Sequence, residues 1–131
     1  MRISSIMFLL AAVLSIIGAV AHEMLGSPKV LAPLATSNLP PDVIWLHHFS
    51  WHVGTVSVLT MAALFIAATR FEHGRLLAVF ATFMSAGFAA LAIGLALFGD
   101  SVVWSTPAPY PWTIITILGV IGLIVYPKPA D

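Results

Sequence analysis

The charged side chains of this chain are separated by four long stretches that contain no Asp, Glu, Lys or Arg, at residues 3–21, 43–69, 76–98 and 101–127. A helix needs about 20 mostly apolar residues to cross the roughly 30 Å hydrocarbon core of a bilayer. The first three stretches meet this length. The pattern predicts an all-α integral membrane four-helix bundle in a single domain, with spans at about 3–25, 43–69, 75–98 and 112–127 and outer loops at 26–42 and 99–111.

The fourth span is the shortest of the four predicted helices. Pro107, Pro109 and Pro111 are expected to prevent regular helix before Trp112, and Pro127 closes the segment. A span this short requires a thinned bilayer or a distorted turn that begins earlier.

Composition agrees with lipid as the solvent. Hydrophobic residues make up 60% of the chain and charged residues 8%, against roughly 25% charged residues in ordinary globular domains. The formal net charge is zero, so the chain offers no basic surface for nucleic acid. The absence of cysteine excludes disulfides, iron–sulfur clusters and thiolate zinc sites.

The first stretch also resembles a signal peptide. Arg2 precedes an apolar run that ends in Ala19-Val20-Ala21, an A-x-A pattern directly before His22. We expect this helix to be retained. If it were cleaved, His22 would become the amino-terminal residue, and its α-amine and imidazole would form a chelating pair for copper.

The positive charges predict the orientation of the bundle. With the N-terminus inside, Arg2, Arg70, Arg75 and Lys128 lie on the cytoplasmic side and only Lys29 lies outside, which satisfies the positive-inside bias. Both termini are therefore predicted to be cytoplasmic. The tryptophans then fall near the outer boundary, where indole rings are favoured: Trp45, Trp51, Trp104 and Trp112.

The same orientation brings four of the five histidines to the outer leaflet. His48 and His52 are four residues apart and share a helix face, a spacing that suits two imidazoles on one metal ion, whereas His47 points about 100° away. His22 from the first helix could be a third ligand, with Glu23 as a ligand or base, in a site for zinc, copper or iron. Alternatively, His22 and His52 could be the axial pair of a haem.

A structural interpretation of these residues is also open. His52 could be a neutral histidine hydrogen-bonded to Glu23, Ser50 or Thr55, because membrane helices use such interhelical polar contacts, each worth on the order of 1 kcal/mol. The hydroxyl groups of the second helix are expected to bond their own helix's carbonyls. His73, in the inner turn, is expected to be solvated.

Small residues recur on the later helices. Ala86, Ala90 and Gly94 are spaced by four, and Gly119 and Gly122 follow on the last helix. Small side chains let membrane helices approach closely. These faces predict either packing within the chain or a seam for a second copy or for a larger membrane complex, in which this chain would be an accessory subunit.

The pattern Gly18-x-x-x-His22-x-x-Leu25-Gly26-x-Pro28, followed by Trp51-His52-x-Gly54-Thr55, resembles a group of small four-helix bacterial inner-membrane proteins without an established activity. The resemblance covers the first two helices and implies the bacterial inner membrane as location, with His22 and His52 as the pair of interest. Members often carry Glu near Ser27, which this chain lacks. No catalytic motif decides whether the protein is an enzyme, and one acting on a lipid or quinone is a third hypothesis.

Overall fold

The computed structural model describes residues 2–72 and 74–127, so His73 and Lys128, on which two predictions rested, lie outside the described residues. The described part of the chain is helical and contains no strand. Its α-helices are α1 (Ile3–Ala21), α2 (Ser27–Ala35), α3 (Pro41–Ala68), α4 (Gly74–Phe98) and α5 (Pro109–Ile124). A π-helical turn, His22–Gly26, joins α1 to α2, and a 3-10 turn, Ser101–Ser105, precedes α5. The predicted all-α class is confirmed.

Three helical segments are long and apolar enough to cross a membrane: Ile3–Ala35, Pro41–Ala68 and Gly74–Phe98. Their outward side chains are apolar, as in Phe83 and Phe98, which are 78% and 91% exposed. Lipid is the solvent that such a surface requires. Helix α5 has 16 residues and spans about 24 Å, so a fourth crossing stays a prediction, as does the side of the membrane that each end faces.

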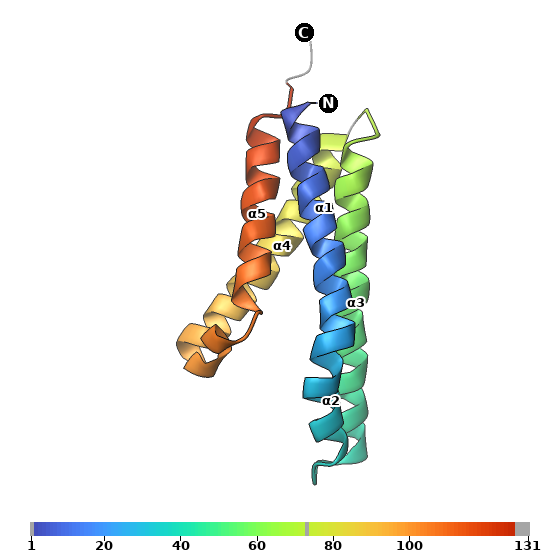
Figure 1. Cartoon of the computed structure of the whole chain (residues 1–131), viewed down its shortest axis with the longest axis vertical. Coiled ribbons are helices and arrows are strands. Elements are labelled where there is room, and N and C mark those ends of the chain that lie inside the picture. The colour runs from blue at the N-terminus through green and yellow to red at the C-terminus, as the bar shows by residue number, and fades with distance from the viewer. Residues whose placement is uncertain (1, 73, 128–131) are drawn as a thin grey trace.

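The four helical segments pack in a closed order. Helix α1 contacts α3 and α5, and α4 also contacts α3 and α5, so α1 and α4 occupy opposite corners. Figure 1 shows the start of α1 and the end of α5 at the same end of the molecule. Towards the other end, α4 and α5 diverge from the column formed by α1, α2 and α3. The helices are therefore packed together mainly near the termini.

Two predicted boundaries differ from the structure. Helix α2 occupies residues 27–35 of the predicted outer loop, because Pro28 lies in its first turn, where a missing backbone N–H costs nothing. Helix α5 begins at Pro109 instead of Trp112 for the same reason, since its prolines fall in the first turn. Prolines thus mark the starts of both helices, and α2 also continues through Pro33.

Small residues set the distances between helices. On α4 the buried residues after Gly74 are all Ala, Thr or Ser. On α5, Gly119 packs against Thr82 of α4, and Gly122 packs against the ring of Phe8 on α1. Phe8 is fully buried and stacks on Phe65 of α3, with ring centroids 6.0 Å apart. Gly119 and Gly122 therefore serve packing within the chain.

Replacement of Gly122 by Ala should destabilise the bundle. The added Cβ would overlap the Phe8 ring, which is fully buried and cannot move aside without disturbing Phe65. We expect a loss of about 1–3 kcal/mol in the free energy of unfolding, measured by denaturant titration in detergent micelles. Gly94→Ala is the matched control, because a Cβ there meets no atom within 4 Å. Equal effects of the two substitutions would contradict this packing.

Candidate functional site

The polar cluster at the far end of α1 faces a single stripe of α3. Val58, Ala62 and Phe65 are buried on α3, and Thr55 and Trp51 extend the same face by further steps of three and four residues. This face packs against α1. The sequence therefore aims Trp51 and Thr55 at the first helix, at the point where α1 gives way to the π-helical turn.

The π-helical turn His22–Gly26 presents two adjacent polar residues to α3. Its wider hydrogen bonding is seen where the Ser27 N–H donates to the His22 carbonyl, five residues back. In a regular α-helix neighbouring side chains diverge by about 100°. Here His22 and Glu23 both reach Thr55. Such turns are rare and occur often at functional sites.

Thr55 is the central group of the cluster. Its hydroxyl donates a hydrogen bond to Glu23 Oε1. The Thr55 hydroxyl oxygen lies 3.0 Å from His22 Nδ1, and Glu23 Oε1 lies 3.2 Å from His52 Nδ1. His22 Nδ1 is 3.8 Å from that carboxylate oxygen. The structure thus joins His22, Glu23 and His52 through one hydroxyl and one carboxylate.

The predicted hydroxyl bonding holds for the neighbours of Thr55 but not for Thr55 itself. Ser50, Ser57 and Thr60 each donate to the carbonyl four residues earlier on α3. Thr55 instead donates across to the first helix, because Glu23 offers a stronger, charged acceptor. Of the structural contacts considered for His52, the one to Glu23 is present.

Trp51 forms one wall of the cluster. Its ring stacks on His22, with centroids 3.8 Å apart and planes inclined by 11°. Gly26 makes room for this ring, since a Cβ there would lie 2.9 Å from Trp51 Cζ2. The indole Nε1 is buried and has no hydrogen-bond partner among the described residues. Neither Trp51 nor Gly26 was assigned a role in the predicted site.

The remaining predicted residues lie outside this cluster. His48 packs on Trp45, with centroids 5.1 Å apart, and His47 Nδ1 lies 3.0 Å from the Val43 carbonyl oxygen. Across residues 2–72 and 74–127, no three His, Cys, Asp or Glu side chains are arranged to hold one metal ion. The structure therefore does not assemble the predicted set of His22, Glu23, His48 and His52, and binding of a metal or haem stays a prediction.

The hydrogen-bond directions fix which imidazole nitrogens are free. Thr55 has one proton and gives it to Glu23, so its oxygen accepts from His22 and the His22 proton is on Nδ1. An ionised carboxylate only accepts, so the His52 Nδ1 facing Glu23 also carries a proton. Each neutral imidazole is then left with an unprotonated Nε2. Both histidines are oriented as metal ligands usually are, with one ring N–H bound to a protein acceptor.

Thr55→Val should destabilise the α1–α3 contact. The substitution keeps the shape of the side chain but removes the hydroxyl that serves both Glu23 and His22. We expect a loss of about 1–2 kcal/mol in the free energy of unfolding in detergent, with Thr55→Ser close to wild type. Thr60→Val, which affects only a bond within α3, is the matched control. A Thr55→Val variant as stable as Thr60→Val would show that the cluster contributes nothing to folding.

Comparisons of the chain with protein families, with curated proteins and with solved structures found no match.

Proposed function

We propose that this integral membrane protein binds a transition-metal ion at its outer face through Nε2 of His22 and Nε2 of His52. The observation that carries the proposal is the polarity of the hydrogen bonds: Thr55 and Glu23 take up the Nδ1 protons of both rings. A carboxylate or hydroxyl on the far ring nitrogen fixes the tautomer of a ligating histidine and raises its basicity. Zinc, copper and iron are the metals that imidazole ligands suit.

The proposal gives Glu23 a different role from that of a direct ligand. Its Oε1 already accepts from Thr55 and His52. We therefore place Glu23 behind the histidines, where its negative charge offsets the charge of a bound cation. Two protein ligands leave coordination positions for water or for an exogenous group, as catalytic metal sites do.

The two histidines differ in their exposure to solvent. The His22 side chain is 32% exposed and is covered by Trp51, whereas the His52 side chain is 57% exposed. Access to the site is therefore from the His52 side, at the boundary where α3 leaves the packed region.

The test is metal uptake by the full chain, purified in mild detergent without chelator and exposed separately to Zn²⁺, Cu⁺ and Fe²⁺. We expect near-stoichiometric metal in the wild type and its loss in His22→Ala and in His52→Ala. Glu23→Gln should bind about 10–100-fold more weakly, the usual effect of removing such a supporting group. His47→Ala and His48→Ala are the matched controls and should bind as the wild type does.

Three outcomes would change this conclusion. Equal loss in His48→Ala would restore the larger ligand set predicted from the sequence. A Soret absorption band in the purified protein, lost in His52→Ala, would identify the metal as haem iron. Folded protein that takes up none of the three metals would sink the proposal and leave the cluster as an interhelical contact.

A second function, that of an accessory subunit, is favoured by one observation on α4. In the stripe formed by Ala86, Ala90 and Gly94, Ala90 is exposed and a Cβ at Gly94 would meet no atom within 4 Å, so these two residues are not needed for packing within this chain. Small-residue faces of this kind mediate helix association in membranes. The stripe is open to a partner helix.

For the accessory role, we expect Ala90→Leu to abolish co-migration with a larger complex on a native gel of detergent-solubilised membranes. Leu95→Phe, at an exposed position of the same helix that points about 140° away from Ala90, should leave migration unchanged. Migration of the wild type as a free monomer would argue against this role.

A further inference from the structure

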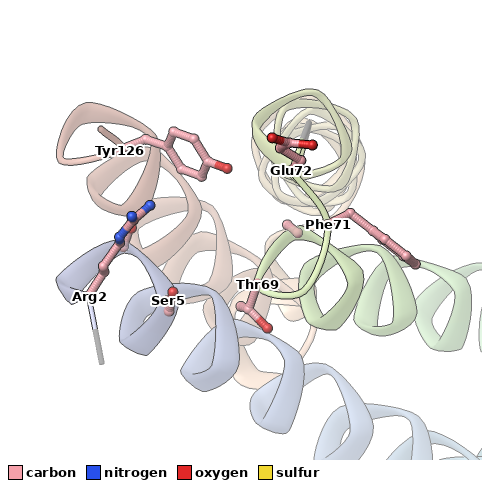
Figure 2. Close-up of a pocket in the computed structure, with 8 residues that line it drawn as sticks. Arg2, Ser5, Thr69, Phe71, Glu72 and Tyr126 are labelled. Carbon is pink, nitrogen blue, oxygen red and sulfur yellow. The ribbon is translucent and has the colours of Figure 1, made fainter. Parts of the chain in front are cut away.

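A pocket of about 360 Å³ opens at the end of the molecule that carries both termini. It lies between the start of α1, the connection from α3 to α4 and the segment after α5 (Figure 2). Its volume falls in the range of roughly 300–1,000 Å³ typical of small-molecule sites. Its polar lining comes from Arg2, Ser4, Ser5, Thr69, Glu72 and Tyr126.

One side of the pocket favours an anion. Helix α1 begins at Ile3 without a side-chain cap, and its first N–H bonded to a backbone carbonyl is that of Ile6. The preceding N–H groups lack an acceptor within the helix, and the helix dipole adds positive potential there. The Arg2 guanidinium lines the same side. The positive charge of Arg2 and the first backbone N–H groups of α1 thus lie at the same wall of the pocket.

Ser4 adds a buried polar side chain to the same wall. Its residue is only 2% exposed and lines the pocket. Its hydroxyl forms no hydrogen bond with any residue in the described ranges, although the other buried serines, Ser15 and Ser85, do. Its side chain belongs to the wall of the pocket at the start of α1.

The other side of the pocket carries a negative charge. Glu72 lines it, and the ion pairs within the described residues join only Glu23 to histidines, so Arg2 and Glu72 do not neutralise each other. In the view of Figure 2, the Tyr126 hydroxyl lies between the guanidinium and the carboxylate. Opposite charges held apart across a pocket match a ligand that is itself a dipole.

From this arrangement we propose that the pocket binds a phosphoethanolamine group. The phosphate lies at the start of α1, where Arg2 and the Ser4 hydroxyl donate to its oxygens, and the ammonium lies at Glu72. A free phosphate dianion or a phosphoglycerol group would bring no positive charge to Glu72. The pocket sits where membrane-crossing helices end, which is the depth of lipid headgroups. Phosphatidylethanolamine therefore carries the group that fits best.

The test measures binding of lipids to the full chain, delipidated in detergent, by native mass spectrometry and by the rise in melting temperature. Short-chain phosphatidylethanolamine should bind at least about tenfold more tightly than phosphatidylglycerol or phosphatidylcholine, because each charge-assisted hydrogen bond is worth that much. Glycerophosphoethanolamine tests a soluble source of the same group. If glycerophosphoethanolamine binds as tightly as phosphatidylethanolamine, the natural ligand is a soluble ester. If it binds at least 100-fold more weakly, the natural ligand is the membrane lipid.

Two variants separate recognition from folding. Arg2→Gln should weaken both phosphatidylethanolamine and phosphatidylglycerol about tenfold, whereas Glu72→Gln should weaken only phosphatidylethanolamine and so abolish the preference. Arg70→Gln removes an exposed cation near the same turn that does not line the pocket, and it should bind as the wild type does. Equal affinity for the three lipids, or an unchanged preference in Glu72→Gln, would overturn the proposal.

Discussion

The fold depends on close approach between helices, because lipid provides almost no hydrophobic force to bring apolar helices together. Close contact therefore has to come from small side chains and from polar groups that need partners. Near the termini the small residues are sufficient: Gly119 admits Thr82, and Gly122 admits Phe8. At the other end, α4 and α5 diverge from α1 and α3 (Figure 1), and the polar contacts of Thr55 hold α1 against α3.

Glu23 imposes the strictest condition on that polar end. A carboxylate at the edge of a membrane is costly unless donors surround it. The π-helical turn rotates Glu23 towards Thr55 and His52, which supply these donors. Meeting this requirement fixes the tautomers of both histidines and leaves their Nε2 atoms free. The structural and ligand-binding interpretations of the cluster are thus compatible, because the contacts that stabilise Glu23 also orient the imidazoles.

Hydropathy was sufficient to predict the three long helices, because each one must present an apolar surface about as long as a bilayer is thick. It missed α2, whose residues were predicted to be loop, and it misplaced the start of α5, because prolines in a first turn resemble loop residues. His22 and His52 were predicted as a pair both from the histidine pattern and from the resemblance, and in the structure both lie near Glu23 Oε1. Spacing alone could not show that His48 lies apart from the His22–Glu23–His52 cluster. Two residues on one helix face can have different neighbours, and the neighbour of His48 is Trp45. Nor does a single sequence signal a π-helical turn, on which the direction of Glu23 depends.

The closed order of the helices also separates the surfaces to which functions are assigned. The histidine cluster belongs to α1 and α3, whereas the open stripe of Ala86, Ala90 and Gly94 belongs to α4, which lies opposite α1. The pocket proposed for phosphoethanolamine lies at the start of α1, about 28 Å along the helix from His22. A partner helix on the stripe of α4 would not cover the histidine cluster, because that cluster lies on the opposite side of the bundle. A chain docked through this stripe would therefore keep its histidine cluster uncovered.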